Sequence, residues 1–590
     1  MKRSPRAVIG RKLNENKFVK CTRVTRMDRI WLKNYPAGIP AEINPDEFGS
    51  IADLLQQVFA RFAERPAYHN LGRTISYAEL ERLSRAFAAY LQGLPDMAKG
   101  ERVAIMLPNL LQYPVVLFGI LRAGMTVVNV NPLYTARELA HQLKDSGAKA
   151  IVIVENFAQT LQHVLPDTKV RHVITTQIGD MLPIPRRWLV NLAIKYIRKK
   201  VPPWQIDAAT TLDNALERGA TAAFTPPSID AEDLAFLQYT GGTTGVAKGS
   251  MLTHRNILAN LEQTGIWVSV SFAKGKEIVI APLPMYHIFC LTATLSFMKW
   301  GSLSVLITNP RDLPALVKEM GKWKFTALSG VNTLFNSLLN TPGFDRLDFS
   351  TIKVVVGGGA AVQKPVAERW KQLTGHHLTE AYGLTEASPG VCAMPLNAPW
   401  DGTIGLPLPS TEVSIRDDAF NEMPVWTGVG DIDKHTGELC VRGPQVMKGY
   451  WNNPAETASA FEDGWLKTGD VGHIDPLGRV TITDRKKDMI LVSGFNVYPN
   501  EVESVVAAHP GVLECAVVAV PDEKSGEAVK VVIVRKDASL TQESVILHCK
   551  ALLTNYKVPR HVVFCETLPK TPIGKILRRE LRDTGNATVV

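Results

Sequence analysis

Apolar and polar positions follow two alternating periods along most of the chain. Short runs rich in β-branched residues are followed by longer stretches with apolar residues at helical spacing, in the pairs 102–106 with 110–122, 126–129 with 136–146, and 150–154 with 157–164. Strands that alternate with helices in this way are typical of parallel sheets covered by helices on their faces. The pattern therefore predicts an α/β fold with a large N-terminal lobe.

A second, smaller unit is predicted at the C-terminal end. Pro499 suits the first turn of a helix that Gly511 would end, and β-rich runs follow at 514–520 and 529–534. We place the hinge at Lys487. The expected organisation is thus a basic extension, a large lobe and a small mobile α+β domain, at residues 1–26, 27–486 and 487–590.

One long uncharged stretch raises the question of a membrane span. Residues 278–298 contain no Asp, Glu, Lys or Arg, and 21 residues could cross a bilayer. Pro282, Pro284, Tyr286 and His287 lie inside the stretch, however. A buried strand, a turn and a helix are therefore expected here instead of a membrane span.

Residues 186–200 interrupt the alternation with a basic amphipathic pattern. On a helix, Asn191, Lys195, Arg198 and Lys199 would share one face, and apolar residues would cover the rest. We expect a surface helix packed against the body of the protein. The alternative is a helix that contacts a membrane surface, where each basic residue near anionic lipid contributes about 1 kcal/mol.

Composition and charge narrow the class of protein. The chain has 590 residues, of which 45% are apolar and 21% charged, as in ordinary globular proteins with several domains. Its seven cysteines form no CxxC pair, which argues against a zinc knuckle or a disulfide framework and suits a reducing cytoplasm.

The basic character of the chain is concentrated at its start. Nine of the 66 basic residues lie in the first 26 positions, beside Glu15 alone, and the remaining chain is almost neutral. No nucleic-acid partner is therefore expected. The start itself is interpreted as an Arg-rich targeting peptide, or as a leader joined in front of a chain that begins at Met27, in preference to a functional arm.

The most informative motif is Thr240-Gly-Gly-Thr-Thr-Gly-Val-Ala-Lys248, between a β-rich run at 235–239 and a helix expected to be capped by Thr253. Its glycines let backbone amides approach an anion, while its threonines and lysine add hydroxyl donors and a charge. Lys248 follows Val-Ala instead of glycine, so the spacing excludes a Walker A loop. We interpret the motif as a loop that grips a triphosphate.

Two further motifs suit the rest of a nucleotide. Gly357-Gly-Gly-Ala-Ala361 follows a β-rich run at 353–356, and a turn without side chains can lie flat against adenine, although a plain structural turn would look the same. Tyr382-Gly-Leu-Thr-Glu386 offers a ring to stack on the base. Thr385 and Glu386 add oxygens of the kind that Mg²⁺ prefers.

An apolar site for an acid is expected next to these motifs. Tyr286 and His287 would lie near its carboxyl end, and residues 288–297 would help to wall a tunnel for an acyl chain. A buried histidine with a purely structural role is the competing interpretation of His287.

These motifs together resemble the adenylate-forming superfamily, and most closely the bacterial long-chain fatty acyl-CoA synthetases, over residues 31–583. The stretch 463–487, which begins Asp463-Gly-Trp-Leu-Lys-Thr-Gly-Asp470, is similar to the fatty-acyl signature of that group. The resemblance implies that Asp470 and Arg485 hold the ribose. It also implies that Lys575, in Pro572-Ile-Gly-Lys575, is inserted beside the carboxylate and the α-phosphate, where a cation would stabilise the transition state.

The expected site is then as follows. Catalytic roles are expected for Lys575, Thr240, Glu386 and His287, and magnesium ligation for Thr244 and Glu386. Binding of the nucleotide, or of coenzyme A after a swing of the small domain about Lys487, is expected for Thr240, Gly241, Gly242, Thr243, Thr244, Gly245, Lys248, Gly357, Gly358, Gly359, Ala360, Tyr382, Gly383, Thr385, Asp470, Arg485, Lys487 and Gly494.

The resemblance implies a ligase that uses ATP, Mg²⁺ and coenzyme A to convert long-chain fatty acids to acyl-CoA through an acyl adenylate. A fatty acyl-AMP ligase, a medium-chain or aryl acid-CoA ligase and a non-catalytic fatty-acid binding module are the alternatives. We expect a cytoplasmic protein, with peripheral contact to the inner membrane through residues 186–200 as an option. The oligomeric state is open, and a homodimer is one option.

Overall fold

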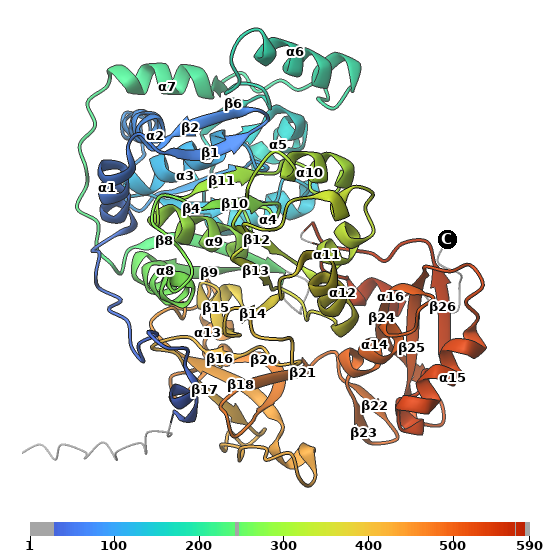
Figure 1. Cartoon of the computed structure of the whole chain (residues 1–590). Helices are drawn as coiled ribbons and strands as arrows, with labels where there is room; N and C mark the ends of the chain where they lie inside the picture. Colours follow the sequence, from blue (N-terminus) through green and yellow to red (C-terminus); the bar gives the residue numbers. More distant parts are fainter. Residues whose placement is uncertain (1–28, 242–246, 573, 584–590) are drawn as a thin grey trace, which may run out of the picture.

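Two large sheets form the N-terminal lobe of the computed structural model, which describes residues 29–241, 247–572 and 574–583 (Figure 1). The first sheet is parallel except for the β8–β9 hairpin. Its order is β7 (Thr210–Thr211), β6 (His172–Thr176), β5 (Ala150–Val154), β3 (Arg102–Met106), β4 (Thr126–Asn129), β8 (Leu234–Gly241) and β9 (Ala247–Thr253).

The second sheet is parallel in its centre and antiparallel at its two edges. Its order is β16 (Leu406–Pro407), β15 (Gly390–Ala393), β14 (Thr379–Gly383), β13 (Val354–Gly357), β12 (Ala327–Gly330), β10 (Ile278–Ala281), β11 (Leu303–Leu306), β1 (Pro66–Asn70) and β2 (Arg73–Ser76). The predicted α/β class is confirmed.

Helices cover the sheets as the strand and helix alternation predicted. The largest apolar core joins both sheets to α1 (Ile51–Phe62), α2 (Tyr77–Gln92), α3 (Gln112–Arg122), α8 (His254–Ser269) and α9 (Ile288–Lys299). The other face of the first sheet is covered by α4 (Ala136–Ser146) and α5 (Ala158–Val164). The other face of the second sheet is covered by α10 (Leu313–Met320), α11 (Asn332–Leu339) and α12 (Lys364–Thr374). Thr253 caps α8, as expected, by accepting a hydrogen bond from the backbone of Asn256.

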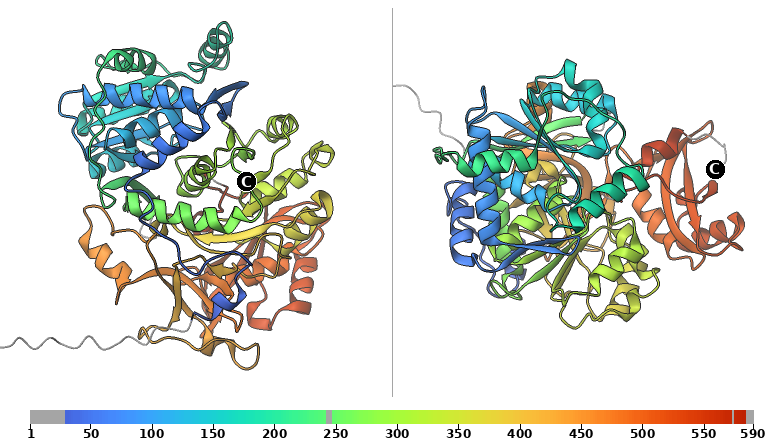
Figure 2. Two further views of the ribbon diagram at one scale, coloured as in Figure 1. Left: turned by 60° about the vertical axis from the view of Figure 1, so that its left-hand side comes forward. Right: turned by 90° about the horizontal axis from the view of Figure 1, so that it is seen from above.

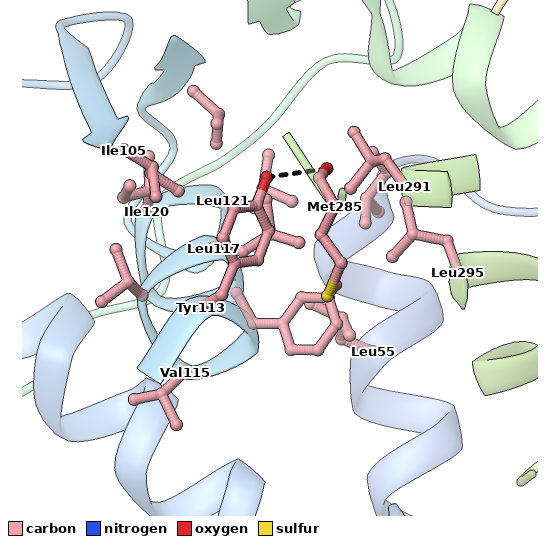
Figure 3. Packing of buried hydrophobic residues seen from close by; sticks show 14 of the residues in the cluster. Leu55, Ile105, Tyr113, Val115, Leu117, Ile120, Leu121, Met285, Leu291 and Leu295 are labelled. Atoms are coloured by element: carbon pink, nitrogen blue, oxygen red, sulfur yellow. Dashed lines mark hydrogen bonds between the residues drawn. The ribbon is translucent and has the colours of Figure 1, made fainter. Parts of the chain in front are cut away.

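The core also fixes the loop between β10 and α9. Tyr113 on α3 is fully buried, and its hydroxyl donates to the carbonyl oxygen of Met285 at 3.0 Å (Figure 3). Met285 is itself buried among leucines of α9 and α1. Since Met285 lies two residues before His287, this hydrogen bond holds the segment that carries a predicted site residue.

Residues 278–298 form strand β10, a loop and helix α9, as expected. Within the ranges that the structure describes, no helix is long and apolar enough to span a membrane.

Residues 186–200 form a helical segment on the surface that is attached to the body of the protein, as expected. The segment forms α6 (Arg186–Leu192), followed by a π-helical turn at Ala193–Ile197, and it stands at the periphery of the lobe (Figures 1 and 2). It is attached by polar contacts, in which Asn191 accepts from the backbone of Gly179 and Arg187 pairs with Asp213. Several of its apolar side chains are exposed, among them Trp188, Leu189 and Ile197. The basic residues Lys195, Arg198 and Lys199 are exposed as well.

A third sheet links the lobe to the small domain. It contains β17 (Glu412–Arg416), β18 (Gly437–Arg442), β20 (Trp465–Ile474) and β19 (Phe461–Glu462), with β21 (Val480–Arg485) paired to β20. A short helix, α13 (Pro454–Ala460), precedes β19.

The small domain has its own sheet and projects from one side of the lobe (Figure 2). The strand order is β23 (Phe495–Val497), β22 (Ile490–Val492), β25 (Gly526–Arg535) and β24 (Val512–Asp522), with β26 (His561–Cys565) beside β25. Its helices are α14 (Pro499–Ala507), α15 (Gln542–Leu552) and α16 (Arg578–Asp583). Helix α14 begins at Pro499 as expected but ends before Gly511. The domain boundaries, including the one at Lys487, stay predictions.

Candidate functional site

A cavity of about 830 Å³ lies between the large lobe and the end of the small domain. Residues distant in sequence line it, because the C-terminal ends of neighbouring strands and the segment before α16 meet there. Of the predicted site residues, those that line the cavity are Thr240, Lys248, His287, Gly358, Gly359, Tyr382, Gly383, Thr385, Glu386, Asp470, Arg485, Lys487 and Lys575.

Other predicted residues lie elsewhere. Gly241 is the last residue of β8. Gly357 and Ala360 do not line the cavity, and a side chain at Gly357 would collide with Val362 at 2.6 Å, so close packing accounts for that glycine. Gly494 lies on the exposed turn between β22 and β23, away from the cavity. The predicted residues Gly242, Thr243, Thr244 and Gly245 fall outside the described residues, as does the extension 1–26.

The β8–β9 hairpin carries the phosphate-loop motif. Thr240 and Lys248 are directly opposite each other across the two antiparallel strands. Lys248 pairs with the carboxylate of Glu456, and its ammonium lies 5.4 Å from the centre of the Tyr450 ring. The hairpin thus presents a hydroxyl and a cation at the same edge of the cavity.

Tyr450 also contacts the predicted magnesium ligand. Its hydroxyl donates to Oε1 of Glu386 at 2.8 Å. Sequence reasoning missed Tyr450 and Glu456. The only local signal was an aromatic pair between Gly449 and Pro454, and nothing in that pattern shows which distant residues it faces.

The predicted ribose-binding pair forms at the edge of the third sheet. Asp470 on β20 lies opposite Arg485 on β21, and Arg485 Nε is 3.1 Å from Asp470 Oδ1. The Tyr382 hydroxyl donates to Oδ2 of the same carboxylate at 2.5 Å. Burial, and then the nearby Asp470 charge, raise the pKa of Tyr382 far above its ordinary value, so the phenol stays protonated. The Tyr382 ring and the Asp470–Arg485 pair are therefore held as one unit.

Glycine is required where the backbone lines the cavity after β13. A Cβ on Gly358 would lie 3.0 Å from the carbonyl oxygen of Ala381, and Gly359 has a φ of +75°. A residue with a side chain would therefore be crowded at the first position and strained at the second. The turn leaves a flat backbone surface beside Tyr382 on the neighbouring strand.

The small domain places Lys575 in the cavity through a close contact with α11. The Thr333 hydroxyl donates to the carbonyl oxygen of Gly574 at 2.9 Å, and a Cβ on Gly574 would lie 2.7 Å from that hydroxyl oxygen. Burial, and next the positive charge of Arg485, lower the pKa of Lys575 to about 7. The Lys575 ammonium is therefore held in a buried place where its charged form is unfavourable by itself. A bound anionic group would stabilise that charged form.

His287 reaches the same cavity from the large lobe. It precedes α9, and its Nδ1 accepts a hydrogen bond from the backbone of Phe289 at 3.4 Å. Burial, and next the charge of Lys575, lower the pKa of His287 to about 4. The ring is neutral at physiological pH, with Nδ1 as an acceptor and Nε2 as a donor.

From His287 the cavity continues between α8 and α9. It is lined on α8 by Trp267 and Val268 and on α9 by Ala293, Ser296 and Phe297. Such apolar walls suit an alkyl chain, because burying each methylene gains about 0.8 kcal/mol.

The residues present fit Mg²⁺ that arrives with a triphosphate. In the described parts of the chain no group of three or more His, Cys, Asp or Glu residues could hold a metal ion. Glu386 supplies one carboxylate to the cavity, with Thr385 beside it. One carboxylate with substrate phosphates is a usual environment for Mg²⁺.

Comparisons with known proteins agree with this arrangement. Residues 55–451 match the family model described as AMP-binding enzyme, and residues 501–575 match the AMP-binding enzyme C-terminal domain. Over 565 residues, 95% of this chain and 99% of the relative, the sequence is 55% identical to a long-chain-fatty-acid–CoA ligase of Escherichia coli O6:H1. A relative of the same description in Haemophilus influenzae is 49% identical, with 94% and 98% covered.

A solved structure also has a similar fold. ATP-bound MatB from Rhodopseudomonas palustris superposes with a TM-score of 0.76 at 29% identity, over 90% of this chain and 98% of that one.

Proposed function

Because the chain belongs to the AMP-binding enzyme family, we propose that it is a long-chain fatty acid–CoA ligase, which consumes ATP and releases AMP and pyrophosphate. The resemblance to the adenylate-forming superfamily is confirmed. The observation that carries the proposal is the 55% identity, over almost the whole chain, to curated long-chain-fatty-acid–CoA ligases. This identity favours the ligase over a fatty acyl-AMP ligase, a medium-chain or aryl acid ligase and a binding module.

In the first half-reaction, an oxygen of the fatty-acid carboxylate attacks the α-phosphorus of ATP, and pyrophosphate leaves. Tyr382 stacks on the base, while Asp470 accepts hydrogen bonds from the ribose. Lys248 and Thr240 contact the phosphates. Lys575 lies between the carboxylate and the α-phosphate, where its charge offsets their repulsion and stabilises negative charge in the transition state.

Further residues orient the reacting groups. His287 stays neutral and donates from Nε2 to the carboxylate of the acid, whose apolar chain lies between α8 and α9. Glu386, with Thr385 and Thr244, would hold Mg²⁺, and the ion would supply positive charge that neutralises the phosphates.

In the second half-reaction, the thiol of coenzyme A attacks the acyl carbon of the adenylate and AMP leaves. A thiol with a pKa of about 8.5 needs little help to ionise. The small domain swings about Lys487, which withdraws Lys575 and brings the turn with Gly494 to the pantetheine chain. Support for this swing comes from the position of Gly494, which lies on an exposed turn away from the cavity.

The function is tested by carboxylate-dependent pyrophosphate exchange with acids of increasing chain length, with and without coenzyme A. Exchange with long-chain acids, and thioester formation once coenzyme A is added, are expected. Adenylate that accumulates without thioester would favour a fatty acyl-AMP ligase. A preference for aryl or medium-chain acids would favour the other ligase class, and absence of AMP with every acid would refute catalysis.

The lowered pKa of Lys575 predicts a pH dependence of adenylation. Below about pH 7 the ammonium is charged, so kcat/KM, which reports the free enzyme, should fall as the pH rises through about 7. Bound triphosphate favours the charged form, so kcat at saturating ATP should fall only at higher pH. The measurement is the pH profile of pyrophosphate exchange.

The matched control for this profile is Lys575→Arg. A guanidinium stays charged at every accessible pH, so the ratio of wild-type to variant kcat/KM should fall above pH 7. A ratio that is constant from pH 6 to pH 9 would assign the titration to another group.

Contact with an anionic membrane surface through α6 is a further part of the proposal. Trp188, Leu189 and Ile197 are 58%, 64% and 80% exposed, and Lys195 and Arg198 lie on the same segment. Apolar side chains beside cations suit the interface of an anionic bilayer. A surface-bound enzyme could take its acid directly from lipid.

Vesicle sedimentation tests this contact. The double change Trp188→Ser with Ile197→Ser should weaken binding to vesicles rich in phosphatidylglycerol by about 10-fold or more, since each large side chain contributes at least about 1.5 kcal/mol when buried. The control is Leu547→Ser, which alters a 72% exposed leucine on α15. Equal sedimentation of both variants would exclude α6 as the contact.

A further inference from the structure

One face of α9 lines the cavity over the whole length of the helix. The lining residues recur at intervals of about four, as Ile288, Phe289, Thr292, Ala293, Ser296 and Phe297, and Trp300 continues the row. At 1.5 Å per residue this row extends about 18 Å from the site of His287, which corresponds to roughly 14 carbons of an extended alkyl chain. The row therefore marks the path and the approximate reach of an acyl chain.

The far end of this path meets a buried carboxylate. Glu277 directly precedes β10 and lines the cavity, and its side chain has no exposed surface. Its Oε1 accepts hydrogen bonds from the backbone of Ala273 and from Nζ of Lys353, both at 2.7 Å. Its Oε2 is buried and has no hydrogen-bond partner among the residues that the structure describes.

The partner of Glu277 reaches the surface. The Lys353 side chain is 34% exposed and lines a separate surface hollow beside Lys371 and His376. Its ammonium lies 5.6 Å from the centre of the Phe272 ring, and that ring packs edge-on against Phe297 at 5.5 Å. The ion pair and Phe272 thus form a wall with the cavity on one side and solvent on the other.

We propose that the Glu277–Lys353 ion pair is the end stop of the acyl channel and sets the longest acid that the enzyme activates. This inference rests on the proposed function. A terminal methyl group can fill the space in front of the wall. A longer chain would have to separate the pair and leave a buried carboxylate without its cation, which is strongly unfavourable.

The test is kcat/KM for pyrophosphate exchange with saturated acids from medium to very long chain. Glu277→Ala should move the longest accepted acid up by about two carbons and raise kcat/KM for those acids about 15-fold, because each buried methylene contributes about fourfold. Phe272→Ala removes another part of the same wall and should act in the same direction. Glu277→Gln keeps the volume of the wall but removes the buried charge, so it should relax the limit less than Glu277→Ala does.

Two further variants control for position. Ala293→Phe blocks the channel midway along α9 and should abolish activity with long acids while sparing medium-chain acids. Glu368→Ala removes the carboxylate of the exposed Lys364–Glu368 ion pair on α12, and it should not change the dependence of kcat/KM on chain length.

The outcomes separate the inference from the proposed function. If the wild-type enzyme activates no acid, the proposed function fails. If the wild-type enzyme has a sharp length limit that neither Glu277→Ala nor Phe272→Ala moves, the end stop lies elsewhere and the inference is overturned. An unchanged profile in Ala293→Phe would overturn it as well, because the channel would not follow α9.

Discussion

Lys575→Ala is expected to lower adenylate formation by about 100-fold or more, which is the size of effect seen when a group that stabilises transition-state charge is removed. The ammonium lies in the same cavity as His287 and the Asp470–Arg485 pair. Neighbouring Lys570 also lines the cavity, but its ammonium is paired with Glu514 at 2.7 Å. The measurement is ATP–pyrophosphate exchange with a long-chain acid.

The two half-reactions distinguish this role from general damage. A preformed acyl adenylate should still react with coenzyme A in the variant, because Lys575 acts only in the first step. Lys570→Ala is the matched control and should change exchange by less than about 10-fold. Equal loss of both half-reactions in Lys575→Ala would contradict the proposed role.

Glu386→Gln is expected to lower adenylation by about 100-fold at a magnesium concentration that saturates the wild-type enzyme, because a neutral amide lacks the negative charge of the carboxylates that usually bind Mg²⁺. The amide oxygen can still accept the hydrogen bond from Tyr450, so the local geometry is kept. The measurement is the dependence of exchange on magnesium concentration, and the variant should need far more Mg²⁺ for half-maximal activity.

Tyr450→Phe provides the comparison. It removes the hydroxyl that donates to Glu386 and keeps the ring beside Lys248. We expect a loss of less than about 10-fold and a small change in magnesium dependence. If Glu386→Gln shows the same magnesium dependence as the wild-type enzyme, Glu386 does not hold the metal.

Much of the fold could be predicted from local patterns. The strands at 102–106, 126–129 and 150–154 were predicted with their observed bounds. Such runs are almost entirely buried, so their apolar residues have to be continuous and the signal in the sequence is strong. Segment 186–200 shows the limit of such patterns. Its periodicity identified a surface helix, but the contacts that attach it, such as the pair of Arg187 with Asp213, could not be read from that periodicity.

Some residues of the site could likewise be predicted from the sequence, and others could not. The loop motifs supplied candidate groups for the phosphates, the base and Mg²⁺, because each motif lies within a few residues of one strand end. The roles of Asp470, Arg485 and Lys575 came from the family resemblance. Tyr450 and Glu277 were missed, since their significance lies in contacts with Glu386 and Lys353 that no local pattern reports. The sequence by itself therefore determined the elements, their alternation and the chemical groups available. Only the tertiary structure decided which groups share a cavity, which carboxylates are buried and how the pKa of Lys575 is set, because burial and electrostatic coupling depend on distances between segments that the chain brings together only on folding.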